Sequence, residues 1–230
     1  MKVLAIDTSN FTLGVALING TQVIGEYTTN VKKNHSVRVM PAIESVLRDC
    51  DTSPKELTKI VVAQGPGSYT GVRIGVTIAK TLAWTLKIPL SAVSSLEVLA
   101  ANGRYFDGLI SPLFDARRGQ VYTGLYEYDN DNLKTITEDC NILCSEWVMK
   151  LKEYNRPILF VGQDVEIHRE AITEVLGDLA IFVPVQLFNS RPSELAFIGL
   201  SKDEVDIHNF VPNYIRMAEA EANWLEQQGK

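Results

Sequence analysis

The first thirty residues alternate between apolar runs and polar turns, which predicts three short strands. Apolar and β-branched residues fill 3–6, 12–18 and 22–28, and the turns between these runs fall at 7–10 and at Asn19-Gly20. An Asn-Gly pair between two alternating runs is typical of a tight hairpin. The pattern therefore predicts a three-stranded antiparallel meander.

Two longer segments have helical periodicity. From Ser36 to Cys50, at about 100° per residue, the apolar residues share one stripe: Val39, Met40, Ile43, Val46, Leu47 and Cys50. The second segment runs from the glycine-rich stretch at 65–75 to about Lys87, and its apolar arc of roughly 200° is wider than one-sided packing needs. Trp84 lies on a separate stripe with three threonines, as an exposed contact with another protein would. We therefore expect the second helix to be buried on more than one side.

The second half of the chain repeats the order of strands and helices in the first. Strands are predicted at Leu109–Phe114, Gln120–Tyr128, Ile158–Val161 and Ile181–Val185, and helices at Glu146–Tyr154, Glu166–Leu176 and Ser193–Ser201. Strands followed by alternating helices and strands indicate an α/β fold. The repetition predicts two duplicated α/β subdomains, residues 1–103 and 104–230.

Composition excludes several classes of protein. Of 230 residues, 46% are hydrophobic and 22% are charged, which is ordinary for a globular protein and unlike disordered or collagen-like chains. Three cysteines, Cys50, Cys140 and Cys144, are too few for a disulfide framework. No stretch reaches the ~18 apolar residues of a membrane span, and the first apolar run is too short for a signal peptide. We expect a cytoplasmic protein with reduced thiols and no membrane association.

Charge is divided unevenly between the halves. Residues 1–103 carry 10 Lys and Arg against 7 Asp and Glu, net +3, whereas residues 104–230 carry 12 against 21, net −9. A strongly acidic half repels phosphate backbones. We therefore expect any RNA that this protein serves to be held by a partner.

Most catalytic motifs are absent. The sequence has no P-loop signature, nucleophile elbow or zinc-peptidase motif, and the three histidines lack metal-ligand spacing. Cys140 and Cys144 stand four apart, but no histidine or third cysteine completes a set of ligands. The sequence predicts no metal and no cofactor.

Two aspartates and a glycine-rich loop remain as candidates for nucleotide chemistry. Asp7 and Asp115 each follow an apolar strand, and the loop with Gly65, Gly67 and Gly71 joins a strand to a helix, where backbone N–H groups form a natural anion site. The alternatives are aspartates that cap their own turns and glycines that permit tight packing. The first turn, which begins at Asp7, lacks the glycine of a tight phosphate hairpin. Both interpretations stay open at this point.

Several segments together resemble a known family. They are the start KVLAIDTS, the run from His35 to Pro41, GPGSYTGVRIG at 65–75, DARRGQVY at 115–122 and PNYIR at 212–216. In this order they resemble the bacterial tRNA threonylcarbamoyladenosine biosynthesis proteins of the TsaB family, over essentially the whole chain. The resemblance implies an actin-like or Hsp70-like ATPase (ASKHA) fold. It also implies a role in transferring threonylcarbamoyl from threonylcarbamoyl-AMP to the adenosine 3′ of the anticodon, in tRNAs that read codons beginning with A.

The resemblance further implies that this chain is not itself the enzyme. The family is a paralogue of a catalytic subunit, TsaD, which binds metal through two histidines that follow its own glycine loop. Here Ser95 and Leu99 stand at those positions. A serine hydroxyl is a weak ligand, and leucine coordinates nothing. The implied partners are TsaD and the P-loop ATPase TsaE, and tRNA is contacted only through the complex.

The leading hypothesis is a non-catalytic partner that docks through the two helices of the first subdomain. The expected contact residues are apolar: Val39, Met40, Ile43, Val46, Ile74, Ile78 and Trp84. Without the partner, we expect a homodimer through the same surface, because an exposed apolar patch is costly.

Two other function classes compete with this hypothesis. One is a small-molecule kinase or ATPase that uses Asp7, Asp115 and the loop at 65–71. The other is a peptidase, which no nucleophile–base pair or metal set in the sequence supports. His35 could cap the first helix, contact a partner or lie on the surface, and Arg73 could pair across a dimer or with an anion.

Overall fold

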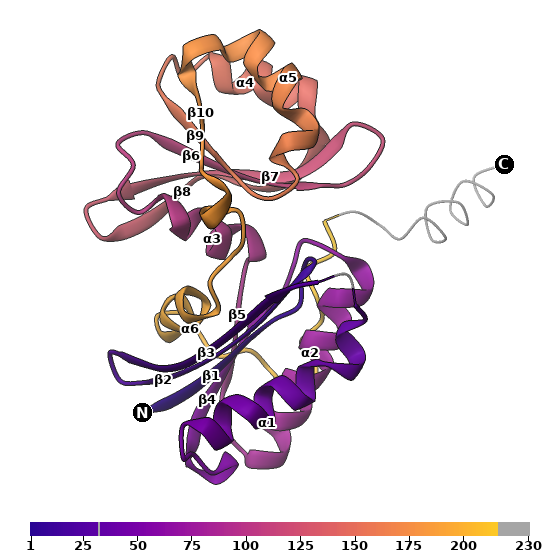
Figure 1. Cartoon of the computed structure of the whole chain (residues 1–230), viewed down its shortest axis with the longest axis vertical. Helices are drawn as coiled ribbons and strands as arrows, with labels where there is room; N and C mark the ends of the chain where they lie inside the picture. The colour runs from indigo at the N-terminus through magenta and orange to yellow at the C-terminus, as the bar shows by residue number, and fades with distance from the viewer. Residues whose placement is uncertain (32, 216–230) are drawn as a thin grey trace, which may run out of the picture.

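Two sheets and their covering helices build the molecule. The structure is a computed structural model that describes residues 1–31 and 33–215. Within these residues the strands form two five-stranded sheets, one from each half of the chain. Figure 1 shows one sheet above the other, with helices between them and on both outer sides. Helix layers and sheet layers therefore alternate.

The first sheet confirms the predicted meander. β1 (Lys2–Asp7), β2 (Thr12–Asn19) and β3 (Gln22–Asn30) pair antiparallel, and β4 (Leu57–Ala63) and β5 (Leu90–Val93) continue the sheet in parallel beyond β1. The strand order is β3-β2-β1-β4-β5. Nearly every residue of β1 and β4 is buried, as expected for parallel strands with helices on both faces.

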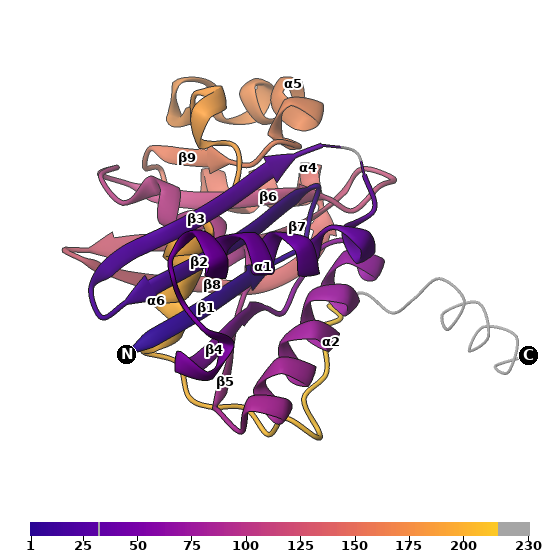
Figure 2. The same ribbon diagram turned by 60° about the horizontal axis from the view of Figure 1, so that its bottom comes forward.

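Two helices cover the outer face of the first sheet. α1 (Val39–Asp49) and α2 (Tyr69–Leu86) lie side by side on this face (Figure 2). Short 3₁₀ turns precede α1 at His35–Val37 and β4 at Pro54–Glu56. Pro41 falls in the first turn of α1, where its missing N–H leaves no bond unmade.

A segment from the end of the described chain covers a further side of α2. This C-terminal strap, residues 203–214, packs Val205, Ile207 and Phe210 against the same core. Lys80 on α2 donates from Nζ to Phe210 O at 2.6 Å and to His208 O at 3.4 Å. The prediction that α2 is buried on more than one side is therefore confirmed.

The second sheet repeats the topology of the first. Its strands are β6 (Leu109–Asp115), β7 (Gln120–Asp129), β8 (Asn132–Leu143), β9 (Ile158–Val161) and β10 (Ala180–Phe182), in the order β10-β9-β6-β7-β8. Its outer face carries α4 (Cys144–Lys152) and α5 (Val165–Leu176). In both sheets the first strand lies at the centre and the second and third form the meander. The predicted duplication is confirmed.

The last helix of each half packs on the sheet of the other half. α3 (Ser95–Ala100) follows β5, yet its Leu96 and Leu99 lie in a core with residues of β6, β7 and β9. α6 (Pro192–Leu200) follows the second sheet, yet its Leu195 and Ala196 pack on β1, β2 and β4. The division between residues 103 and 104 stays our proposal for the two subdomains, and α3 and α6 cross it in opposite directions.

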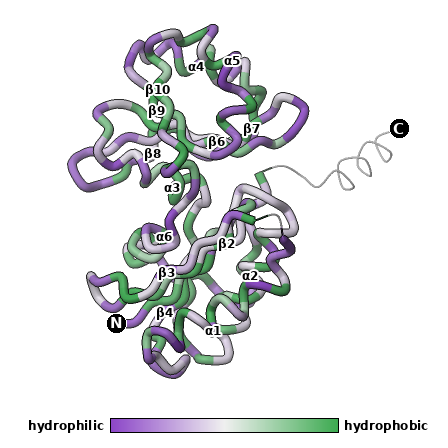
Figure 3. Tube along the Cα trace, viewed as in Figure 1, coloured by the Kyte–Doolittle hydropathy of each residue, from purple (hydrophilic) through white to green (hydrophobic). Residues whose placement is uncertain are grey.

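Hydrophilic residues gather in the loops at the periphery, and apolar residues line the layers (Figure 3). Among the described residues, no helix is long and apolar enough to cross a membrane.

Candidate functional site

A cleft of about 570 Å³ opens between the two halves, where β1 and β6 end. From the first half it is lined by the β1–β2 turn and the start of α2, and from the second by the β6–β7 turn and the start of α5. The lining residues are Asn10, Phe11, Gly67, Ser68, Tyr69, Thr70, Phe114, Asp115, Ala116, Arg117, Tyr122, Asp164 and Ile167. Of the residues predicted to bind nucleotide, Gly67 and Asp115 line this cleft, whereas Asp7, Gly65 and Gly71 do not.

Asp7 caps its own turn. It is only 3% exposed. Its Oδ1 accepts hydrogen bonds from Ser9 N at 2.9 Å and Ser9 Oγ at 2.7 Å, and its Oδ2 accepts one from Ser190 Oγ at 2.7 Å. Both oxygens are thus engaged inside the protein, and the side chain does not face the cleft. The geometry supports the turn-capping interpretation of Asp7.

The glycine-rich loop packs directly on the β1–β2 turn. A Cβ on Gly67 would lie 2.1 Å from Ser9 O, and one on Gly71 would lie 2.2 Å from Thr8 O. Hydrogen bonds hold the two segments together, because Ser68 N donates to Ser9 O at 2.7 Å and Thr8 Oγ1 donates to Gly71 O at 2.7 Å. On Gly65 a Cβ would meet Asn213 O of the strap at 2.9 Å. These contacts support glycines that serve tight packing.

Asp115 belongs to a titratable cluster in the opposite wall of the cleft. His168 Nε2 lies 3.1 Å from Asp115 Oδ1, and Asp115 N donates to Asp164 Oδ2 at 3.0 Å. Burial raises the pKa of Asp164, and the neighbouring charge of Asp115 adds to the rise. No motif in the sequence marks Asp164, although it follows the buried strand β9 much as Asp115 ends β6. His168 comes from one turn of α5 further on, and no pattern pointed to it.

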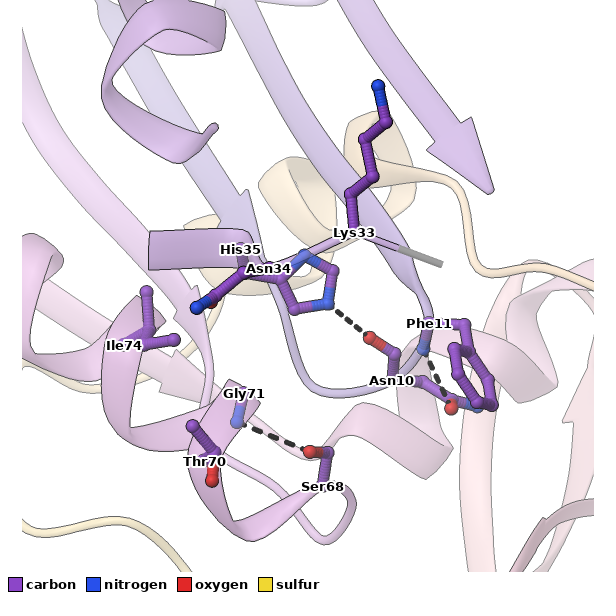
Figure 4. A pocket seen from close by; sticks show the side chains of 9 residues that line it. All are labelled: Asn10, Phe11, Lys33, Asn34, His35, Ser68, Thr70, Gly71 and Ile74. Atoms are coloured by element: carbon purple, nitrogen blue, oxygen red, sulfur yellow. Dashed lines mark hydrogen bonds between the residues drawn. The ribbon is translucent and has the colours of Figure 1, made fainter. Parts of the chain in front are cut away.

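A second hollow, of about 320 Å³, lies beside the starts of α1 and α2 (Figure 4). His35 lines it, and its Nε2 lies 2.7 Å from Asn10 O, which links the start of α1 to the β1–β2 turn. The cap of the 3₁₀ turn is Asn34, whose Oδ1 accepts from Ser36 N at 3.0 Å. His35 therefore ties two segments together and caps nothing. Lys33 and Ile74 also line this hollow.

Ser95 and Leu99, which the family resemblance was expected to place at a relative's metal-ligand positions, are both buried. Ser95 Oγ accepts a hydrogen bond from Gly65 N at 3.1 Å, and Leu99 packs in the core between α3 and the second sheet. Within residues 1–31 and 33–215, no group of three or more His, Cys, Asp or Glu side chains could hold a metal ion. Both side chains thus have structural contacts in this chain.

Large apolar side chains are exposed along α1, α2 and the turn before α1. Val37 is 70% exposed, Met40 46% and Trp84 64%. Ile74 and Ile78 are half-buried and pack against the core beneath the helices. These residues come from segments far apart in the sequence that cover one face of the sheet. They form what we call the helical face: Val37, Met40, Ile74, Ile78 and Trp84.

The structure corrects the prediction that Val39, Ile43 and Val46 contact a partner. All three are buried, with Val39 fully inaccessible, and they pack on the first sheet. The reason is that the most apolar stripe of an amphipathic helix faces its own core, so only side chains at the stripe's margin, such as Met40, stay available. Arg73 on α2 stacks over the Tyr69 ring at 5.2 Å and donates to its hydroxyl at 3.0 Å.

Comparison with known proteins identifies the family. The model of the family described as "TsaD: tRNA N6-adenosine threonylcarbamoyltransferase" matches residues 22–224. The chain is 61% identical over 228 residues to the tRNA threonylcarbamoyladenosine biosynthesis protein TsaB of Bacillus subtilis (strain 168), which covers 99% of this chain and 100% of that protein. It is 34% identical over 135 residues to the TsaB protein of Escherichia coli (strain K12), 58% of each chain.

Solved structures share the fold. A protein from Pseudomonas aeruginosa described as similar to the peptidase YEAZ superposes with a TM-score of 0.81 at 22% identity, over 94% of this chain and 99% of that one. At that identity the likeness concerns the fold alone. The two duplicated mixed sheets form the actin-like ATPase fold. With full-length identity to a TsaB protein, this fold and the match to the transferase model, the chain belongs to the TsaB family of tRNA threonylcarbamoyladenosine biosynthesis proteins.

Proposed function

We propose that this chain is a non-catalytic subunit in the formation of threonylcarbamoyladenosine in tRNA. It binds the catalytic paralogue TsaD, acts with the ATPase TsaE in the cytoplasm, and meets tRNA only through the complex. The observation that carries the proposal is the helical face, where Met40 and Trp84 are exposed on the outer side of α1 and α2. Met40 is near the start of α1 and Trp84 near the end of α2, and large exposed apolar side chains are a common mark of a protein interface.

Two observations support the non-catalytic role. Asp7, the first candidate for holding phosphate and metal, has both carboxylate oxygens bonded to Ser9 and Ser190. Leu99 and Ser95 are buried where the catalytic relative's metal ligands would stand. The same geometry weakens the kinase or ATPase alternative, which uses both Asp7 and Asp115, because only Asp115 lines the cleft.

Charge on the helical face should abolish partner binding. We expect Met40→Glu and Trp84→Glu each to weaken binding to TsaD at least tenfold, because a buried apolar side chain contributes about 1.5–3 kcal/mol and tenfold corresponds to about 1.4 kcal/mol. Titration calorimetry with purified TsaD measures this. The same variants should shift the isolated chain from dimer to monomer in sedimentation velocity, since the homodimer is proposed to use the same face.

Met149→Glu provides the matched control, because Met149 is 57% exposed on α4 of the other subdomain. It should bind TsaD as the unchanged chain does. Val39→Glu is unsuitable, since a charge in the core would unfold the protein. Reconstituted tRNA modification gives a second readout. We expect modification to require this chain, to be absent with this chain alone, and to be lost when the Trp84→Glu variant replaces it. Equal binding by all variants would place the interface elsewhere.

A further inference from the structure

A half-buried carboxylate joins the two subdomains at the point where the chain passes from one to the other. Only Ser94 separates β5 of the first sheet from α3, which packs on the second. Ser94 Oγ donates to Asp139 Oδ2 on β8, and the Tyr126 hydroxyl on β7 donates to Asp139 Oδ1. Asp139 thus ties the crossover residue to the second sheet through two hydrogen bonds to one charged group.

The neighbouring serine ties the same crossover to the first subdomain. Ser95 N donates to Gly65 O at 2.9 Å, and Gly65 N donates to Ser95 Oγ at 3.1 Å. Gly65 belongs to the loop that leads into α2. At the link between β5 and α3, hydrogen bonds therefore tie two consecutive residues to opposite subdomains: Ser94 to the second and Ser95 to the first.

The sequence of β7 leaves room for the Asp139 carboxylate. A Cβ on Gly124 would lie 2.9 Å from Asp139 Oδ1, and the register of β7 against β8 shifts beside this glycine. Burial and the Asp139 charge raise the pKa of Tyr126, so its hydroxyl stays a donor at physiological pH. Burial also raises the pKa of Asp139, although the bonds from Ser94 and Tyr126 act in the opposite direction.

Apolar packing at this junction cannot define an angle by itself. α3 places Leu96 and Leu99 against the second sheet and Val98 in the core of the first. The helix therefore lies between two apolar surfaces. Hydrophobic contact is non-directional, whereas hydrogen bonds to an ionised group are strong and depend on orientation. We propose that Asp139, with Ser94 and Tyr126, is a hinge lock that holds the second subdomain at one angle to the first.

The lock predicts that removing the carboxylate loosens the interdomain angle without unfolding either sheet. Spin labels are attached through a non-natural side chain at the exposed positions Thr81 and Thr173, one on each subdomain, so that the three cysteines stay in place. The labelled chain is diluted into an excess of unlabelled chain, so that only distances within one chain are measured. Pulsed dipolar spectroscopy should give one narrow distance distribution in the unchanged chain and at least a twofold broader one in Asp139→Ala. Hydrogen exchange of the Leu96 and Glu97 amides, which donate to Ser94 Oγ, should quicken about tenfold.

The control is Asp129→Ala, because Asp129 lies in the same hairpin but is exposed and forms an ion pair with Lys134 of that hairpin. Its asparagine neighbour donates to it as well, and neither bond crosses between subdomains. This variant should keep the narrow distribution, as should Ser94→Thr, which keeps the hydroxyl. Tyr126→Phe removes one of the two hydrogen bonds to Asp139, so it should broaden the distance distribution less than Asp139→Ala does. If Asp139→Ala fails to fold, Tyr126→Phe is the variant that tests the lock. An unchanged width in Tyr126→Phe and Asp139→Ala, or equal broadening in Asp129→Ala, overturns the lock. The experiment needs no partner protein, so its result is independent of TsaD binding.

Discussion

Three titratable side chains meet in the wall of the cleft, and their arrangement sets how the protein responds to pH. The Asp164 carboxylate accepts a hydrogen bond from the backbone N–H of Asp115, and the imidazole of His168 contacts the Asp115 carboxylate. Burial raises the pKa of Asp164 above its usual value, although the hydrogen bond from the Asp115 backbone N–H lowers it. Of the two nearby side chains, Asp115 raises this pKa and His168 lowers it. A group whose pKa is higher in the folded state binds its proton more tightly there than in the unfolded chain. Its stabilising contribution is therefore complete at low pH and is lost as pH rises through the folded-state pKa.

Asp164→Asn should remove this pH dependence. The free energy of unfolding of the variant, relative to the unchanged chain, should rise as pH increases from about 4 to about 7, since carboxyl pKa values lie near 4 in unfolded chains. The amide oxygen can still accept from Asp115 N, so the fold is kept. Urea unfolding at several pH values measures the difference. Asp178→Asn, at an exposed aspartate just beyond the same helix, should show no such trend, and a flat difference for Asp164→Asn would contradict the assignment.

At the residue scale the sequence pointed to particular positions but left their roles open. Asp7, Gly67 and Gly71 are typical of a phosphate site, and the same residue types are needed to cap a turn and to bring a helix close to it. The distances in the structure distinguish the two roles, because the backbone of Thr8 and Ser9 lies directly against Gly67 and Gly71, where a bound phosphate would need space. Ser190, which completes the bonding of Asp7, lies 183 residues away, and no local pattern can show such a contact.

Helix periodicity predicted where the helices lie in the sequence, but it did not predict which of their side chains are exposed. α1, α2, α4, α5 and α6 all form within a few residues of the expected bounds, because an apolar stripe at helical spacing is a strong signal. β8 was not predicted, since an edge strand with polar residues such as Lys134, Thr135 and Glu138 lacks the alternation of a half-buried one. The apolar stripe of α1 is its buried side, so only side chains at the edge of the stripe, such as Met40, stay exposed for the proposed contact with a partner.

The C-terminal strap covers one flank of α2, and Lys80 is one of the residues that hold it there. Lys80 Nζ satisfies the carbonyls of His208 and Phe210, and Asn213 N donates to Gln64 O at 2.8 Å. We expect Lys80→Met to lower the free energy of unfolding by about 1–2 kcal/mol, because it leaves two carbonyls without a donor. Urea denaturation measures this loss.

Limited proteolysis supplies a second measurement of the strap. Cleavage within residues 203–214 should be faster in Lys80→Met than in the unchanged chain. Lys55→Met, at an exposed lysine in the turn before β4, serves as the matched control and should match the unchanged chain in both measurements. Equal cleavage of all three would show that the apolar contacts of Phe210 alone hold the strap.

The whole molecule could be predicted as a duplicated α/β fold because both halves carry the same order of elements. The packing of α3 and α6 on the opposite sheets could not be predicted. Helices of six and nine residues carry no sequence pattern that indicates which sheet they will cover. Their apolar residues fit either core equally well. Long-range packing of this kind follows from the three-dimensional arrangement of the layers.

This arrangement predicts a single cooperative unfolding transition. Each sheet loses one covering helix if the other half unfolds, so the halves should unfold together. Trp147 is buried and donates from Nε1 to Ser111 Oγ at 2.9 Å, which makes its fluorescence a reporter of the second subdomain. In a Trp84→Phe and Trp224→Phe background, its urea midpoint should coincide with that of far-UV circular dichroism. Two separated midpoints would show that the halves are independent.

The exchange of α3 and α6 also bears on how such a protein can change during evolution. A gene fragment that encoded either half alone would yield a sheet with one bare apolar surface, which invites aggregation. Substitutions on α6 and on β1 are expected to be coupled, because these elements share one core across the boundary. The two halves are therefore inherited as one unit, and a shuffled or transplanted half is expected to fail unless its borrowed helix travels with it.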